Sequence, residues 1–368
     1  MIMSNARIAL FVPSLNGGGA ERVMVLLANG IAERGLPVDL VTLCSEGTYR
    51  NEVSPDVNVV NLSARRMLLS IFPLLKYLRK SRPFALISAL DYANIIAVCA
   101  QKLSLVATRV VVTEHNTLSI SNANDARAVR RLVPFLMRKF YRHAHGILAV
   151  SSGVADDLAR MLNIDRQAIR VAYNPVVTEK MITRSYETID HPWLADGQQP
   201  FILAVGRLTG AKDFPTLIRA FKQLRDTDDV RLVILGEGPQ REQLEKLVLE
   251  LELQGSVLLP GFSDNPFAWM RRSALFVLSS SWEGLPTVLI EAMACGVPVV
   301  STNCPSGPAE ILENGKWGRL VPVGDVDALA KAMLESLADA EPPAVATRSR
   351  RFDVSNAVDE YLVAIHAD

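Results

Sequence analysis

The chain has 368 residues, which is more than one ordinary hydrophobic core holds, so two domains are expected. Hydrophobic residues make up 49% and charged residues 21%, which excludes a disordered, collagen-like or disulfide-scaffolded chain. The net charge is zero and no basic-aromatic motif of a nucleic-acid reader occurs, so nucleic acid is not expected as a partner. Residues 1–180 nevertheless carry a net charge of +9 and residues 181–368 a net charge of −9. This division favours two domains with different partners, although a drift of solvated surface charge would produce it as well.

The expected compartment is the cytoplasm. Four cysteines (Cys44, Cys99, Cys295 and Cys304) are far apart and form no CxxC pair, which suits a reducing compartment. The first apolar run is short and a glycine-rich turn follows it, unlike a signal peptide. The sequence also lacks a stretch of about 18 uncharged apolar residues, so no membrane-spanning helix is predicted.

In the first half, apolar runs of strand length alternate with amphipathic helical patterns. Strands are predicted over residues 8–12, 38–43, 85–88, 109–113 and 146–150, and the first helix over 20–34. Continuous apolar strands that alternate with helices predict a parallel sheet covered on both faces.

The alternation lapses after Pro175 and then restarts. Residues 177–199 are polar and are predicted to be a linker. Strands are then predicted over residues 201–205, 231–235, 257–259, 275–278, 297–301 and 319–321, and a last helix over 354–366. The expected fold class is α/β, with a Rossmann-like domain over 1–176, a second over 200–345, and a C-terminal helical segment over 346–368 that could cross back to the first domain.

Ligands of open α/β sheets bind beyond the carboxyl ends of the strands, where three unusual clusters fall. The first is the glycine-rich turn from Asn16 to Arg22. Consecutive glycines such as Gly18 and Gly19 let a backbone approach a ligand, and the following helix start offers N–H groups to an anion. It matches neither GxGxxG nor a Walker motif, so a phosphate contact and a tight strand-to-helix turn both remain open.

The second cluster is the loop that follows the strand predicted over 201–205. Arg207 and Lys212 flank this loop, and Asp213 is expected to cap the next helix. Two cations at this spacing could hold one diphosphate, because arginine forks onto phosphate oxygens while lysine acts as a point charge. A solvated pair of surface charges is the alternative.

The third cluster is the segment from Ser281 to Gly296. Glu283 is expected in the loop after a strand, and Glu291 on a helix among apolar neighbours. A carboxylate in apolar surroundings is destabilising by several kcal/mol unless it is paired or faces a ligand. Two carboxylates with free helix N–H groups between them suit a nucleotide sugar, whereas a helix with one buried salt-bridged glutamate is the structural alternative.

Together, the E-x7-E segment from Glu283 to Glu291, the G-R-x4-K segment from Gly206 to Lys212 and the early GGGAER turn resemble the retaining glycosyltransferases of family 4. The resemblance covers nearly the whole chain and is strongest over 201–323. It implies the GT-B fold, in which two Rossmann-like domains face each other across a cleft.

The resemblance also implies roles for individual residues. Glu291 would hold the ribose hydroxyls, Glu283 would hold hydroxyls of the transferred sugar, and Arg207 and Lys212 would neutralise the diphosphate. The remaining donor-binding residues implied by the resemblance are Gly18, Gly19, Gly261, Phe262, Gly284, Leu285, Thr287 and Val288. Of these, Phe262 is assigned to the nucleobase through its backbone, and Thr287 and Val288 to the diphosphate.

His115 follows a strand of the first half, where the resemblance implies a histidine near the transferred sugar. Without the resemblance, a single histidine in this position is an ordinary loop residue, and Glu114 competes with it for an active-site role. His143 and His145 could suggest a metal site but lack carboxylate companions, so none is expected. The resemblance implies metal-independent transfer with no cofactor besides the co-substrate.

The predicted activity is retaining transfer of a hexose or N-acetylhexosamine from a nucleoside diphosphate sugar, with UDP favoured by the resemblance. The expected acceptor is a glycan or lipid-linked glycan of cell-surface polysaccharide assembly. Two basic amphipathic stretches, 65–82 and 127–142, suit contact with an anionic membrane face, although core-packed helices with basic outer faces would show the same pattern. The alternatives are a non-hydrolysing nucleotide-sugar epimerase and a non-catalytic nucleotide-sugar-binding partner.

Overall fold

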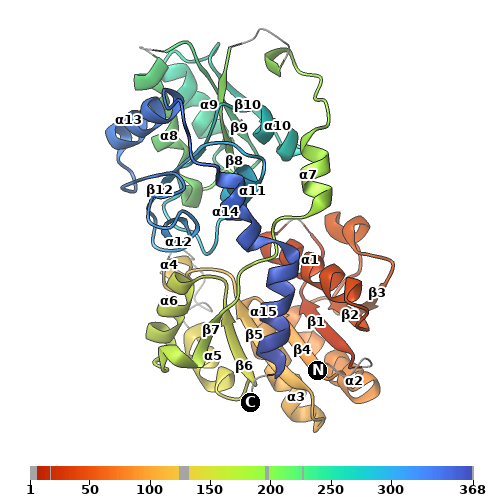
Figure 1. The fold of residues 1–368 in the computed structure, drawn as a ribbon. Helices are drawn as coiled ribbons and strands as arrows, with labels where there is room; N and C mark the ends of the chain where they lie inside the picture. Colours follow the sequence, from red (N-terminus) through yellow and green to blue (C-terminus); the bar gives the residue numbers. More distant parts are fainter. Residues whose placement is uncertain (1–5, 17, 124–131, 195–198, 226–227, 367–368) are drawn as a thin grey trace. The chain divides into compact units, whose positions relative to one another are not determined.

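The computed structural model describes residues 6–16, 18–123, 132–194, 199–225 and 228–366, and divides them between two compact units (Figure 1). Unit 1 comprises Met1–Val176 together with Val354–Asp368, and unit 2 comprises Val177–Asp353. Among the described residues, no helix combines the length and the hydropathy that crossing a bilayer requires.

Unit 1 is built on a parallel sheet of seven strands in the order β3-β2-β1-β4-β5-β6-β7. The strands are β1 (Ile8–Val12), β2 (Val38–Thr42), β3 (Val57–Asn61), β4 (Ala85–Ala89), β5 (Arg109–Glu114), β6 (Gly146–Ala149) and β7 (Ile169–Val171). The helices are α1 (Gly19–Glu33), α2 (Ile71–Ser81), α3 (Asp91–Ser104), α4 (Leu118–Ala123), α5 (Val133–Tyr141), α6 (Ser152–Leu162) and α15 (Val354–His366).

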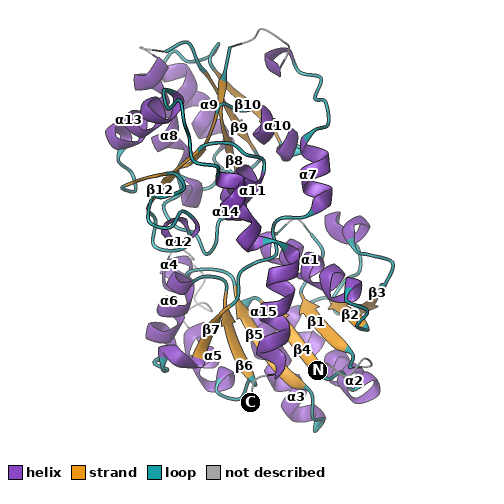
Figure 2. Ribbon diagram, viewed as in Figure 1, coloured by secondary structure: helices purple, strands orange, loops and turns teal. Residues whose placement is uncertain are grey.

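Helices cover this sheet because its strands are apolar along their whole length. Every residue of β1, β2 and β4 is buried. Helix α15 comes from the end of the chain and packs beside α1, where Val358 and Tyr361 join the core formed with Leu10 and Leu27. Helix α3 packs against both α2 and α5 in a second group of helices (Figure 2).

Unit 2 repeats the plan with six parallel strands in the order β10-β9-β8-β11-β12-β13. The strands are β8 (Phe201–Val205), β9 (Arg231–Leu235), β10 (Val257–Gly261), β11 (Leu275–Leu278), β12 (Val299–Thr302) and β13 (Arg319–Val321). The helices are α7 (Glu179–Ser185), α8 (Phe214–Arg225), α9 (Arg241–Glu250), α10 (Pro266–Arg272), α11 (Thr287–Ala294), α12 (Pro308–Ile311), α13 (Val326–Leu337) and α14 (Val345–Ser349). Helices α8, α9 and α13 share one core with the strands, built around residues such as Phe221, Leu244 and Met333.

The predicted α/β class with two parallel sheets is confirmed, whereas some elements differ from the sequence prediction. Strands β3 and β7 were not predicted, because β3 carries exposed Asn58 and Asn61 and β7 has only three residues. Strand β12 begins at Val299 rather than at residue 297, since Pro298 has no N–H to give to the sheet. The stretch predicted to be a linker contains α7, which packs against α10. Its residues 195–198 lie outside the described residues.

Candidate functional site

In unit 2, the loops that follow β8, β9 and β10 are joined by backbone hydrogen bonds at the carboxyl ends of the strands. Leu208 N–H donates to the carbonyl of Glu237 at 2.9 Å, and Gly236 N–H donates to the carbonyl of Gly261 at 2.8 Å. Gln240 N–H donates in turn to the carbonyl of Leu208 at 3.1 Å. The loop that carries Arg207 and Lys212 is therefore held by its neighbours along the strand ends.

A second set of bonds ties the Lys212 loop to the loop after β11. Ser281 N–H donates to the carbonyl of Ala211 at 2.8 Å, and Ser279 Oγ donates to the carbonyl of Lys212 at 2.7 Å. Lys212 Nζ then lies 2.6 Å from Glu283 Oε1, which also accepts a 2.6 Å hydrogen bond from Ser280 Oγ. The Lys212 and Glu283 side chains are only 18% and 14% exposed, so this ion pair is largely shielded from water.

Helix α11 begins four residues after Glu283, which is one partner of this ion pair. Its N-cap, Pro286, makes no side-chain capping bond, so no side chain from that position covers the N–H groups of Thr287 and Val288. The start of a helix attracts anions, because its N–H groups and dipole both point toward negative charge. Gly284 and Leu285, which lead into the helix, are buried, and so is Glu291 at 2% exposure.

The other predicted residues of unit 2 lie at the same end of the sheet. Arg207 is exposed just beyond β8. Gly261 ends β10, and Phe262 follows it with 70% of its surface exposed. Asp213 stands directly before α8, and its Oδ2 accepts a 2.8 Å hydrogen bond from Thr216 Oγ1. Unit 2 thus brings Lys212 and Glu283 into direct contact and places Arg207 and Phe262 in loops at the strand ends, whereas Glu291 lies within α11.

Two loops at this end were missed by the sequence analysis, although glycines after strands marked them. Gly236 has φ +142°, and a Cβ atom there would overlap the carbonyl of Gly206. Gly307, after β12, has φ +92°, and a Cβ atom there would overlap the Pro286 ring and lie 3.0 Å from Gly284 O. Both glycines let a loop pass closer to the predicted site than any side chain would allow.

In unit 1, the carboxyl group of Glu21 lies against the glycine-rich turn. Gly18 is the N-cap of α1, and Glu21 folds back so that its carboxyl group lies against Gly18. Burial raises the pKa of Glu21 above its usual value. Gly19 is exposed, and no atom of the described residues outside its own helix turn and chain neighbours lies within 4 Å of a Cβ built on it. Gly17 lies outside the described residues.

His115 and Glu114 follow each other at the end of β5 but lie in different surroundings. Glu114 is 1% exposed and accepts hydrogen bonds from Asn94 Nδ2, at 2.9 Å, and from the Tyr141 hydroxyl. Glu114 therefore connects β5 to α3 and α5, which is a structural contact rather than a position open to a ligand. His115 is 8% exposed, its Nε2 lies 3.0 Å from Thr113 Oγ1, and burial lowers its pKa to about 4.

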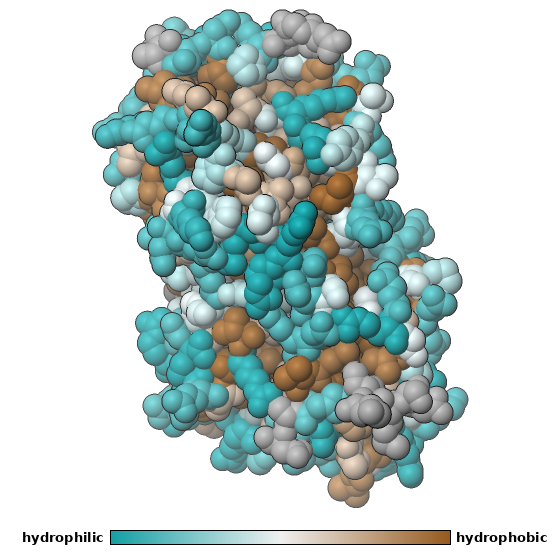
Figure 3. All heavy atoms as spheres, in the orientation of Figure 1, coloured by the Kyte–Doolittle hydropathy of each residue, from teal (hydrophilic) through white to brown (hydrophobic). Residues whose placement is uncertain are grey.

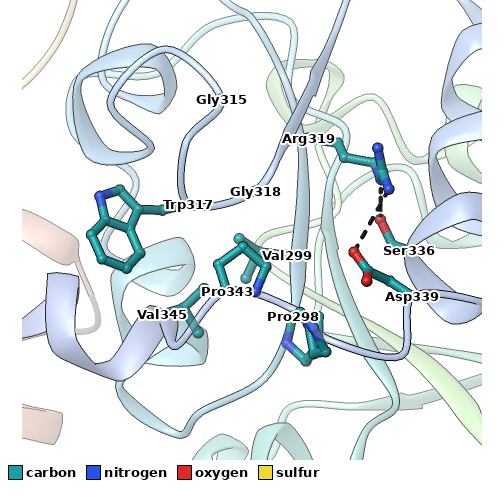
Figure 4. A pocket seen from close by; sticks show the side chains of 11 residues that line it. Pro298, Val299, Gly315, Trp317, Gly318, Arg319, Ser336, Asp339, Pro343 and Val345 are labelled. Atoms are coloured by element: carbon teal, nitrogen blue, oxygen red, sulfur yellow. Dashed lines mark hydrogen bonds and ion pairs between the residues drawn. The ribbon is translucent and has the colours of Figure 1, made fainter.

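A cavity of about 150 Å³ in unit 2 lies away from these loops. Its lining includes Pro298, Val299 and Arg319, at the amino ends of β12 and β13. Arg319 donates a 3.1 Å hydrogen bond to Ser336 Oγ and pairs with Asp339 at 3.8 Å (Figure 4). The motif residues lie at the opposite, carboxyl ends of the strands, so this cavity is not the candidate donor site.

Apolar side chains emerge on the two segments predicted to contact a membrane. Before and within α2, Leu68, Leu69 and Phe72 are 74%, 58% and 73% exposed, and in the α5 region Leu132 and Phe135 are 60% and 66% exposed. Residues 127–131 of the second segment lie outside the described residues. Apolar patches also reach the surface at the end of unit 1 where α3 lies (Figure 3). Both helices also bury apolar side chains, such as Leu78 of α2 and Met137 of α5, so each segment is packed on one side and exposes apolar side chains on another.

Family models match both halves of the chain: "Glycosyltransferase Family 4" over residues 17–180 and "Glycosyl transferases group 1" over residues 185–351. One curated relative is the N-acetylgalactosamine-N,N'-diacetylbacillosaminyl-diphospho-undecaprenol 4-alpha-N-acetylgalactosaminyltransferase of Campylobacter jejuni. It is 32% identical over 94% of this chain and 96% of its own length. The lipopolysaccharide core biosynthesis glycosyltransferase LpsE of Rhizobium meliloti is 29% identical, covering 88% of this chain and 86% of its own.

Solved structures match over almost the whole chain. Anabaena HepE, crystallised in complex with UDP and glucose, superimposes with a TM-score of 0.79 at 19% identity, covering 99% of this chain and 100% of HepE. The apo form of the lipopolysaccharide outer core galactosyltransferase WaaB gives a TM-score of 0.73 at 20% identity, covering 98% of this chain and 99% of WaaB. At these identities the matches establish the fold, which is GT-B.

Proposed function

The chain belongs to glycosyltransferase family 4, and we propose that it transfers a hexose or N-acetylhexosamine from a UDP-sugar, with retention at the anomeric carbon. The observation that carries this proposal is the pairing of Lys212 with Glu283 beside the start of α11. A cation and helix N–H groups can bind a diphosphate, and a carboxylate can accept hydrogen bonds from sugar hydroxyls.

The proposed chemistry follows from where charge develops. The acceptor hydroxyl oxygen forms a bond to the anomeric carbon as the sugar–phosphate bond breaks, and the hydroxyl proton passes to the leaving diphosphate. Negative charge develops on the diphosphate in this step, and fixed cations and N–H groups stabilise such charge best. Lys212, Arg207 and the N–H groups of Thr287 and Val288 would take that part without a divalent metal. The carboxylate of Glu283 would accept hydrogen bonds from hydroxyls of the transferred sugar, and buried Glu291 would accept those of the ribose.

The remaining predicted residues would complete the contacts with the donor. Gly261 and exposed Phe262 suit the nucleobase end, because a base can stack on or lie beside an aromatic residue. In unit 1, Gly18 and Gly19 offer backbone N–H groups at the start of α1, and His115 offers a ring nitrogen.

For the acceptor, we propose a lipid-linked glycan at the cytoplasmic face of an anionic membrane. The Campylobacter relative is named for a diphospho-undecaprenol-linked substrate, which supports this class of acceptor. The segment 65–82 has no aspartate or glutamate, and its exposed cations Arg65, Arg66, Lys76 and Lys80 accompany exposed Leu68 and Phe72. Apolar side chains with flanking cations are the pattern that adsorbs to anionic lipid surfaces.

A donor panel tests the proposed activity. UDP-, GDP- and ADP-sugars are screened by thermal shift, since a ligand at a concentration of 100 Kd stabilises the native state by about 2.7 kcal/mol. The stabilising sugar is then incubated with and without a lipid extract that contains glycan acceptors. Acceptor-dependent release of UDP with a retained anomeric configuration is the expected result. Epimerisation of the sugar without any acceptor would instead identify a nucleotide-sugar epimerase, and binding without turnover would identify a non-catalytic binding partner.

A further inference from the structure

The ring of His115 contacts the hydroxyl group of Thr113, which donates its proton to the carbonyl oxygen of Ser88. Thr113 Oγ1 lies 2.9 Å from the carbonyl oxygen of Ser88 and 3.0 Å from His115 Nε2. A threonine hydroxyl has one proton to donate and lone pairs to accept with. A carbonyl oxygen only accepts, so the Thr113 proton must point to Ser88 for that contact to be a hydrogen bond.

The tautomer of His115 follows from this arrangement. With the Thr113 proton on the Ser88 carbonyl, the contact with His115 is a hydrogen bond only when Nε2 carries a proton and donates it. The opposite assignment would turn the Thr113 proton toward Nε2 and leave two acceptor oxygens facing each other at 2.9 Å. The geometry therefore selects the Nε2–H tautomer, in which Nδ1 keeps its lone pair.

Within the described part of the chain, Nδ1 of His115 has no hydrogen-bond partner. It has less than 1 Å² of exposed surface. Leaving a buried polar atom without a hydrogen bond is unfavourable, so such an atom in a native structure calls for an explanation. A second acceptor near the end of the same strand, Asn94 Oδ1, is also buried and has no hydrogen-bond partner among the residues that the structure describes.

We propose that Thr113 is a positioning residue, which fixes His115 in the Nε2–H tautomer and so presents Nδ1 as a hydrogen-bond acceptor to a hydroxyl group of the bound substrate. The tautomer follows from the contacts of Thr113 alone, whereas the hydrogen bond to a substrate hydroxyl depends on the proposed glycosyltransferase function. Because Nδ1 is enclosed, a ligand that reaches it must open this enclosure, and the new hydrogen bond forms away from bulk water.

The side chains of Thr113 and its neighbour Glu114 have different hydrogen-bond partners. The Glu114 carboxylate is occupied by Asn94 and Tyr141, and Asn94 Nδ2 donates to the Thr113 carbonyl as well, at 2.9 Å. These bonds fix the backbone at the end of β5. Among the side-chain hydrogen bonds of the described residues, only the one with the Thr113 hydroxyl involves the His115 ring. Losing Glu114 would disturb the strand, but losing the Thr113 hydroxyl would release the ring.

Nitrogen-15 NMR of histidine-labelled protein at pH 7 tests the tautomer directly, and a His115→Gln variant assigns the signal among the five histidines. The expected spectrum shows a protonated Nε2 and an unprotonated Nδ1 for His115. Thr113→Ser, which keeps the hydroxyl, should preserve this pattern, and Thr113→Val should give a mixture of tautomers. A protonated Nδ1 in the unsubstituted protein would overturn the proposal even if Thr113→Val failed to fold. An unchanged pattern in folded Thr113→Val would overturn it as well.

The ligand part is tested with UDP-glucose and UDP-N-acetylglucosamine against UDP alone. A sugar nucleotide that raises the melting temperature should also shift the Nδ1 resonance, and UDP alone should not. Stabilisation without that shift would refute the role of Nδ1 while leaving the donor site in place. Failure of both sugar nucleotides to stabilise the protein would instead count against the proposed UDP-sugar function. The proposed hydrogen bond from a substrate hydroxyl to Nδ1 would then be refuted as well. The tautomer measurement in the free protein is independent of both outcomes.

Discussion

Lys212 Nζ lies 2.6 Å from Glu283 Oε1, although the two residues are 71 positions apart and follow different strands of the unit 2 sheet. The pair is held from both sides, because Ser279 binds the Lys212 carbonyl and Ser280 binds the Glu283 carboxylate. In the free protein the two charges neutralise each other. A bound diphosphate and sugar would offer each of them a new partner.

Replacing Lys212 by alanine should lower kcat/KM on the order of 10²- to 10³-fold, because it removes a cation from the leaving diphosphate. The measurement is initial-rate kinetics with the stabilising UDP-sugar, alongside circular dichroism to show that the fold persists. Lys246→Ala, at an exposed position on α9, is the matched control and should leave the rate unchanged. A rate near that of the unsubstituted protein for folded Lys212→Ala would remove Lys212 from the site.

Glu291→Gln should weaken binding of UDP by about 10- to 100-fold, since hydrogen bonds to charged groups contribute about 1.5–3 kcal/mol. The buried position makes the shape-conserving amide the suitable change. Isothermal titration with UDP gives the affinity, and Glu250→Gln on the exposed face of α9 serves as the control. Equal UDP affinities for the two variants would exclude a ribose contact by Glu291.

Gly307→Ala should destabilise unit 2 by about 1–3 kcal/mol and weaken donor binding at the same time. The added Cβ would overlap Pro286 and strain a residue with φ +92°, so the turn at Gly284–Pro286 would have to move. Gly255→Ala is the control, because no atom that the structure describes beyond the neighbouring residues lies within 4 Å of a Cβ there. Urea unfolding and UDP titration measure the two effects. Donor affinity equal to that of Gly255→Ala would show that the loop does not support the site.

Burial of His115 predicts a specific dependence of stability on pH. Its native pKa is about 4, below the ordinary value of 6.5, so between these values the unfolded state binds a proton that the native state does not. His115 therefore makes its full contribution to the free energy of unfolding above about pH 6.5. This contribution is lost as the pH falls toward 4, and the free energy of unfolding then changes by up to about 1.4 kcal/mol per pH unit.

This contribution is measured by urea unfolding between pH 4 and 7. His115→Gln should flatten the slope in that window, whereas His143→Gln, at an exposed histidine, should leave it unchanged. The same slope in His115→Gln and in the unsubstituted protein would contradict the lowered pKa.

Membrane adsorption should depend on the exposed apolar residues around the start of α2. Combined replacement of Leu68, Leu69 and Phe72 by serine should reduce flotation with phosphatidylglycerol-containing vesicles several-fold, because it removes the inserting apolar area. Leu249→Ser, at a 57% exposed leucine of unit 2, is the control. Binding should also weaken as salt is raised. Absence of vesicle binding at low ionic strength would reject the membrane contact.

The sequence is most informative where strands are continuous apolar runs. Strands β1, β8 and β11 have the predicted bounds because every one of their residues is hydrophobic. Strand β3 was missed because it lies at the edge of its sheet and alternates with exposed asparagines. Its pairing with β2 is a tertiary effect that overrides a weak local pattern.

Part of the candidate site could be found in the same way. Lys212 and Glu283 stood out because charged residues follow apolar strands, and E-x7-E spacing marked Glu291. Their direct pairing could not be predicted, since it depends on the order in which β8 and β11 meet in the sheet. The approach of Gly307 to Pro286 likewise joins segments that only the folded chain brings together.

The proposed donor site is tested most directly by calorimetric titration of UDP-glucose and UDP-N-acetylglucosamine into the unsubstituted protein, Lys212→Ala and Lys246→Ala. Saturable binding of at least one sugar nucleotide is predicted, with equal affinity for the unsubstituted protein and Lys246→Ala and at least about tenfold weaker binding for Lys212→Ala. No binding to the unsubstituted protein, or the same affinity in all three, would contradict the site.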